Sequence, residues 1–121
     1  MAKTALVVDD SKSIRLMVGL TLKDAGFEVV ECENGQLALA AVSSRRFDLV
    51  ITDLNMPVMD GISFIRAMRG NPQCKFTPVL MLTTESNAEK KKAGKDAGAT
   101  GWIVKPFEPE KLLQTIGKVL V

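Results

Sequence analysis

Five short apolar runs alternate with segments of helical periodicity along the chain. The runs are bounded by charged or turn residues, as is typical of strands buried in a parallel sheet; they cover residues 3–8, 27–32, 47–52, 78–82 and 101–104. After four of the runs, apolar residues recur at spacings of three and four, which predicts amphipathic helices, and a polar helix is expected after the fourth run. The alternation predicts an α/β fold, a doubly wound parallel sheet of five strands with helices on both faces.

The predicted helices carry local start signals. Asn34 and Asp60 can cap the second and third helices, and Pro109 suits the first turn of the last. Ser86 and Glu89 have capping-box spacing at the start of a polar fourth helix. The inward positions we expect on the other four helices are Ile14, Met17, Val18, Thr21, Leu22, Ala25, Leu37, Ala38, Ala41, Val42, Ile62, Ile65, Met68, Leu112, Leu113, Ile116 and Leu120.

Length and composition predict one ordinary globular domain. The chain has 121 residues, of which 46% are hydrophobic and 25% charged. A net charge of +2 favours neither nucleic acid nor a membrane as partner, and no apolar run reaches membrane-spanning length. Cys32 and Cys74 have no metal-binding or redox spacing. We therefore expect a cytoplasmic protein.

The absence of histidine narrows the possible chemistry. With no histidine in the sequence, Ser-His-Asp and Cys-His nucleophile schemes and most zinc sites are excluded. Any reaction must use carboxylates, hydroxyls, lysines and a hard cation.

Polar side chains stand where four of the predicted strands end. Asp9 and Asp10 follow the first strand, Asp53 the third, Thr83 the fourth and Lys105 the fifth. Ligands of open α/β sheets bind beyond the carboxyl ends of the strands. If these four strands are neighbours, the five side chains converge on one shallow pocket.

Such a pocket has the chemistry of a magnesium-dependent phosphate site. Three close carboxylates repel one another and need a cation, and an all-oxygen site suits Mg²⁺. A lysine is a point charge for a phosphate, and a threonine hydroxyl can donate to a phosphate oxygen. A carboxylate in this setting can also act as a nucleophile and form an aspartyl phosphate.

Each residue also has a simpler interpretation. Asp9 and Asp10 could cap the first helix, Thr83 could be a turn hydroxyl and Lys105 a solvated lysine. Asp53 could merely end a strand at the surface. Their coincidence at four strand ends favours the functional hypothesis.

The motifs at these positions identify a family resemblance. They are Val7-Val8-Asp9-Asp10, the segment Asp53-Leu54-Asn55-Met56-Pro57-Val58-Met59-Asp60-Gly61, Thr83, and Lys105-Pro106-Phe107. With these motifs the chain resembles response-regulator receiver domains, in particular the stand-alone chemotaxis receivers of the CheY type. The resemblance covers residues 1–121 as a single receiver domain. It implies a flavodoxin-like sheet in the order 2-1-3-4-5.

The resemblance implies a role for each acidic residue. Asp53 would accept a phosphoryl group from a phosphohistidine of a sensor histidine kinase. Asp10, Asp53 and the backbone carbonyl of Asn55 would bind Mg²⁺, and Asp9 would hold metal-bound waters. The protein would be a regulatory phosphoacceptor of two-component signalling, catalysing only its own phosphorylation and dephosphorylation.

The resemblance also implies a switch and an output surface. Lys105 would pair with the phosphoryl group, Thr83 would hydrogen-bond it, and Trp102 would be the aromatic residue that changes position. A downstream protein, the flagellar motor switch or another target, would bind the surface of the fourth helix, fifth strand and fifth helix. We expect a monomer that binds neither nucleic acid nor membrane.

Three alternatives remain open from the sequence. The protein could be a phosphorelay intermediate or a phosphate sink without a motor target, because Lys90, Lys91 and Lys92 stand where enteric chemotaxis receivers are apolar. Those lysines could form a solvated helix face or contact an acidic partner. A magnesium-dependent aspartyl-phosphate phosphatase would need an acid–base aspartate two residues after Asp53, where this chain has Asn55.

Overall fold

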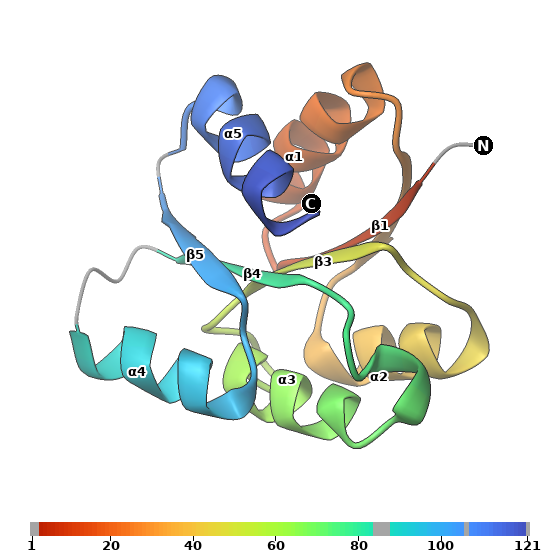
Figure 1. Cartoon of the computed structure of the whole chain (residues 1–121), viewed down its shortest axis with the longest axis vertical. Helices are drawn as coiled ribbons and strands as arrows, with labels where there is room; N and C mark the ends of the chain where they lie inside the picture. Colours follow the sequence, from red (N-terminus) through yellow and green to blue (C-terminus); the bar gives the residue numbers. More distant parts are fainter. Residues whose placement is uncertain (1–2, 84–87, 106, 121) are drawn as a thin grey trace.

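The protein forms one five-stranded parallel sheet with helices on both faces (Figure 1). The computed structural model describes residues 3–83, 88–105 and 107–120. The strands are β1 (Thr4–Val8), β2 (Glu28–Cys32), β3 (Leu49–Asp53), β4 (Val79–Thr83) and β5 (Gly101–Val104). Their order in the sheet is β2-β1-β3-β4-β5, which confirms the predicted topology.

Five helices cover the two faces of the sheet. They are α1 (Lys12–Asp24), α2 (Gly35–Ser44), α3 (Gly61–Arg69), α4 (Ala88–Ala97) and α5 (Pro109–Val119), and a short 3-10 turn (Pro72–Cys74) follows α3. Helices α1 and α5 lie on one face, and α2, α3 and α4 on the other (Figure 1). None of the helices described is long and apolar enough to cross a membrane.

Burial follows the position of each strand in the sheet. All five residues of β1, β3 and β4 are buried, because helices cover both sides of these central strands. The edge strand β2 keeps Glu28 and Glu31 exposed, which confirms its predicted edge position. On the other edge strand, β5, only Ile103 is buried.

Four predicted inward positions are wrong. Met17, Leu37 and Leu113 are 53%, 49% and 37% exposed, and Ala25 is an exposed C-cap residue. Helices α1, α2 and α5 each have more apolar residues than one buried stripe can hold. The stripe that is buried lies one position away from the residue that was predicted to face inward. On α1, for example, Val18 and Leu22 fill it and Met17 turns outward.

Side-chain caps fix the starts of three helices. The Asn34 side chain accepts from Leu37 N at 2.9 Å and that of Asp60 from Ser63 N at 2.7 Å, as predicted. The cap of α1 is Ser11, one residue beyond the aspartate pair. The predicted capping residue Ser86, and Pro106 of the last motif, lie outside the described residues.

Candidate functional site

The three predicted carboxylates meet at the carboxyl edge of the sheet. Strands β1 and β3 are neighbours in register, with Val8 opposite Thr52, so Asp9 and Asp53 leave the sheet side by side. One carboxylate oxygen from each of Asp9, Asp10 and Asp53 lies within 4.8 Å of the others. The parallel sheet therefore assembles the acidic cluster that the sequence predicts.

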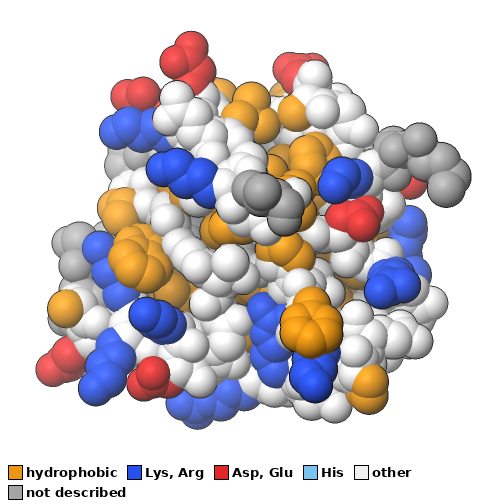
Figure 2. All heavy atoms as spheres, viewed as in Figure 1, with side chains coloured by type: hydrophobic (Ala, Val, Ile, Leu, Met, Phe, Trp, Pro, Cys, Tyr) orange, Lys and Arg blue, Asp and Glu red, His pale blue; other side chains and the backbone are white. Residues whose placement is uncertain are grey.

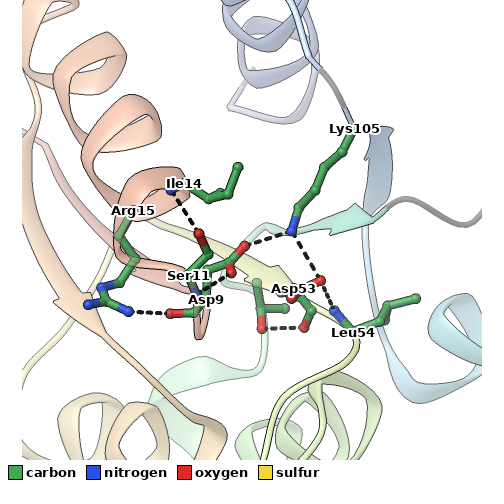
Figure 3. A network of polar contacts seen from close by, with 8 residues as sticks. Asp9, Ser11, Ile14, Arg15, Asp53, Leu54 and Lys105 are labelled. Carbon is green, nitrogen blue, oxygen red and sulfur yellow. Dashed lines mark hydrogen bonds and ion pairs between the residues drawn. The ribbon is translucent and has the colours of Figure 1, made fainter.

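Asp9 is held from three sides (Figure 3). It is 1% exposed. Its Oδ1 accepts from Ser11 N at 2.9 Å, its Oδ2 accepts from Lys105 Nζ at 2.8 Å, and its carbonyl oxygen accepts from Arg15 at 2.6 Å. Asp10, in contrast, is exposed to solvent.

Asp53 is a buried carboxylate with a limited set of donors. It is 7% exposed, and its Oδ1 accepts from Leu54 N at 2.8 Å and lies 3.4 Å from Lys105 Nζ. Burial, followed by the negative charge of Asp9, raises the pKa of the Asp53 carboxyl above its ordinary value, although Lys105 and the Leu54 N–H act in the opposite direction. The surroundings of Asp53 thus disfavour the charged form of its carboxyl group.

Replacing Asp53 by asparagine is therefore expected to stabilise the metal-free protein. Because the folded-state pKa of Asp53 is raised, ionisation opposes folding once the pH exceeds the ordinary aspartate value of about 3.9. At neutral pH without Mg²⁺, Asp53→Asn should show a higher free energy of unfolding than the parent in urea titrations. The gap should close as the pH falls below that value. The same substitution at exposed Asp24 should change little, and a less stable Asp53→Asn at neutral pH would contradict this reasoning.

Lys105 and Thr83 come from the two strands beyond β3. Lys105 N donates to the Thr83 carbonyl oxygen at 2.7 Å, which joins the ends of β4 and β5. Thr83 is 1% exposed and lies one position beyond Leu82, the register partner of Asp53. The Lys105 ammonium lies between the carboxylates of Asp9 and Asp53. Both residues thus stand at the same edge as the acidic cluster.

The loop after β3 brings Asn55 and the start of α3 to the site. Asn55 is exposed. Gly61 N donates to the Leu54 carbonyl oxygen at 2.9 Å, and a Cβ at Gly61 would overlap the Asp53 carbonyl oxygen. Within the loop Val58 has a φ of 71°, which is strained for a β-branched residue. The turn thus holds the first residue of α3 against the backbone of Asp53 and Leu54.

Trp102 lies beside this site on β5 and is 39% exposed. With Lys111 and Thr115 it lines a hollow of about 480 Å³ between β5 and α5. The Lys91 ammonium lies 4.9 Å from the centre of the Trp102 ring. Lys90 and Lys92 are exposed, as expected for a solvated helix face, whereas Lys91 is half-buried.

Two residues at the site, Ser11 and Arg15, were not predicted as parts of it. Ser11 both caps α1 and donates its N–H to Asp9, and Ser at this place is a usual capping signal. Arg15 supports the Asp9 carbonyl and also lies 3.5 Å from Glu31 of β2. Gly61 belongs to the predicted motif after Asp53, but its role in permitting the close approach of α3 to Asp53 was not predicted. Only the path of the folded backbone reveals the contacts of Arg15 and Gly61.

Comparison with known proteins places the chain in a family. The sequence profile of the response regulator receiver domain matches residues 5–117. The chain is 38% identical to the chemotaxis protein CheY of Pseudomonas aeruginosa over 94% of this chain and 93% of that protein. It is 36% identical to the phosphate regulon transcriptional regulator PhoB of the same organism, over 99% of this chain but only 52% of that protein.

A solved structure gives the same result. The chemotaxis response regulator CheY4 of Vibrio cholerae is 56% identical, with a TM-score of 0.95 over 99% of this chain and 100% of that chain. The resemblance to CheY therefore extends to the whole backbone. The chain belongs to the family of response regulator receiver domains, signalling proteins of phosphorelays, and closely resembles the CheY chemotaxis response regulators.

Proposed function

We propose that Asp53 is the residue that accepts the phosphoryl group. The observation that supports this most strongly is the placing of its buried carboxylate beside Asp9, Asp10 and the Lys105 ammonium. An Asp53 oxygen attacks the phosphorus of a phosphohistidine. The P–N bond breaks, an acyl phosphate forms, and the histidine nitrogen keeps the electron pair and takes up a proton. The protein catalyses this step, and the later hydrolysis, only on itself.

The acidic cluster fits a magnesium ion. Two oxygens bound directly to Mg²⁺ at about 2.1 Å are at most about 4.2 Å apart. One oxygen of each of the three carboxylates lies within 4.8 Å of the others, so a side-chain movement of less than about 1 Å would bring any two of them onto one ion. Asp10, Asp53 and the backbone carbonyl of Asn55 would hold the ion, and Asp9 would hold its waters. Bound there, the ion would neutralise charge on the transferred phosphoryl group. Lys105 adds a positive charge from the end of β5.

Asp10→Ala is expected to weaken Mg²⁺ binding more than Asp9→Ala. Asp10 is exposed and free to coordinate directly, whereas both Asp9 oxygens already accept hydrogen bonds from Ser11 and Lys105. Loss of an outer-shell partner reduces metal affinity about 10- to 100-fold, so the direct ligand should have the larger effect. Calorimetric titration with Mg²⁺ measures both constants. Equal affinities for the two variants and the parent would refute the assignment.

The phosphoryl group is expected to act on Thr83 and then on Trp102. A phosphoryl group adds about two negative charges and three acceptor oxygens close to Lys105 and the Thr83 hydroxyl. When Thr83 moves toward it, space opens beside β5, and Trp102 is the large half-exposed side chain positioned to fill it. A difference of a few kcal/mol is enough to convert a mostly inactive population into a mostly active one.

Trp102 emission should report this switch. It is the only tryptophan, and the chain has no tyrosine. Beryllofluoride with Mg²⁺, a phosphoryl analogue, should shift the emission to shorter wavelength as the indole becomes buried, and Thr83→Ala should reduce the shift. An unchanged spectrum with proven analogue binding would mean that Trp102 does not switch.

The partners follow from the position of Trp102. The surface of α4, β5 and α5 changes when Trp102 moves, so we assign it to the downstream protein target, with a sensor histidine kinase as the phosphoryl donor. We propose that the protein acts as a cytoplasmic monomer between the two, in chemotaxis-type signalling. Phosphotransfer profiling against the histidine kinases of the source organism would identify the donor, and transfer from none of them would count against the proposal.

A further inference from the structure

A cation–π contact joins α4 to the edge strand β5. The Lys91 ammonium lies 4.9 Å from the centre of the Trp102 ring, within the range of about 6 Å in which an indole face attracts a cation. Lys91 is half-buried, whereas its neighbours Lys90 and Lys92 are exposed. Of the three consecutive lysines, Lys91 is therefore the one that covers the ring.

The side chains that α4 buries are small. Of its ten residues, Gly94 and Ala97 are the buried ones. Gly94 lies so close to Met81 of β4 that an added Cβ would overlap the methionine sulfur. Small side chains bury little apolar area, so they contribute little to the attachment of a helix. The Lys91–Trp102 contact therefore adds a link between α4 and β5.

We propose that Lys91 positions Trp102 in its outward, half-exposed arrangement and thereby opposes activation of the receiver. The inference rests on the proposed function, in which Trp102 turns inward when Asp53 is phosphorylated. Turning inward separates the ring from the ammonium, so the contact stabilises only the outward state. An exposed cation–π contact shifts such an equilibrium about two- to fivefold.

Lysine and arginine side chains gather on the surface over α4, β5 and α5 (Figure 2). Lys111 lines the same hollow as Trp102, and Lys118 lines a second hollow, of about 350 Å³, that Trp102 also borders. Among the described lysines around the ring, Lys91 is the one whose ammonium lies over it, so removal of its charge should have an effect that removal of a neighbouring charge does not. That difference separates a local contact from the general electrostatic field.

The effect can be measured through thermodynamic linkage. If Lys91 restrains the outward state, Lys91→Gln raises the inward population, and a ligand that favours that state binds more tightly by the same factor. We expect the beryllofluoride concentration at half-saturation, with Mg²⁺ present, to fall about two- to fivefold. Lys92→Gln removes an equal charge from the exposed neighbour and should behave as the parent. Lys91→Arg keeps the cation and should also behave as the parent.

The single indole N–H resonance of Trp102 gives an independent reading. In Lys91→Gln without any ligand, this resonance should move toward its position in the beryllofluoride-bound parent, and in Lys92→Gln it should not. If the parent binds beryllofluoride and both glutamine variants match it, the positioning role of Lys91 is wrong and the proposed function stands. A parent that binds no beryllofluoride overturns the proposed function and this inference with it.

Discussion

Asp53→Asn is expected to abolish phosphorylation. Incubated with acetyl phosphate and Mg²⁺, the parent should gain the mass of one phosphoryl group, and the variant should gain none. An amide oxygen is a far weaker nucleophile than a carboxylate, and asparagine preserves the size of the side chain in a position that is only 7% exposed. The loss should therefore be chemical and not structural.

A matched control keeps this result interpretable. Asp24→Asn makes the same change on an exposed residue at the end of α1, and it should leave phosphorylation unchanged. Thermal melting should show both variants folded, with Asp53→Asn at least as stable as the parent in the absence of Mg²⁺ because a buried charge has been removed. The same mass gain in Asp53→Asn as in the parent would rule out Asp53 as the acceptor.

Gly61→Ala is expected to destabilise the protein by about 3 kcal/mol and to slow phosphorylation. The added Cβ would overlap the Asp53 carbonyl oxygen and stand 3.0 Å from the Leu54 Cα. These atoms belong to the backbone of β3 and its loop, so they cannot rotate away as a flexible side chain can. The first turn of α3 would have to move, and the direction of the Asp53 carboxylate with it.

Gly117→Ala is the control for the change at Gly61. Gly117 lies inside α5, and a Cβ there would meet no atom within 4 Å. Alanine at this position should stabilise the helix by about 0.5–1 kcal/mol, since it lowers the entropy of the unfolded chain and creates no clash. Urea unfolding measures both changes. A Gly61→Ala protein as stable as the parent would show that the contact between α3 and β3 is not tight.

The sequence predicted the architecture well because central parallel strands carry an unambiguous signal. Residues 4–8 and 49–53 have helices on both faces, so their apolar runs indicate buried strands of a parallel sheet. The outward faces of the helices were harder to predict. Helix α1 carries six apolar residues between Ile14 and Leu22, and periodicity alone does not decide which of them turns outward.

The positions of the site residues were predictable for a similar reason. Asp9 and Lys105 directly follow strands and Asp53 is the last residue of one, and parallel strands bring their ends to one edge. Other contacts around the site depend on the paths of loops and on side-chain rotamers. The pattern of residue types along the sequence does not predict either of these. The bond from Arg15 to the Asp9 carbonyl and the Lys91–Trp102 contact are of this kind.

Chemical trapping can show directly which residue carries the phosphoryl group. The parent protein would be phosphorylated from a phosphohistidine donor with Mg²⁺ present, reduced with borohydride and mapped by peptide mass spectrometry. Borohydride converts an aspartyl phosphate into homoserine and leaves an ordinary aspartate unchanged. We expect homoserine at position 53 and at no other aspartate. A peptide containing an unreduced Asp53, together with homoserine at Asp9, Asp10 or another aspartate, would contradict this expectation.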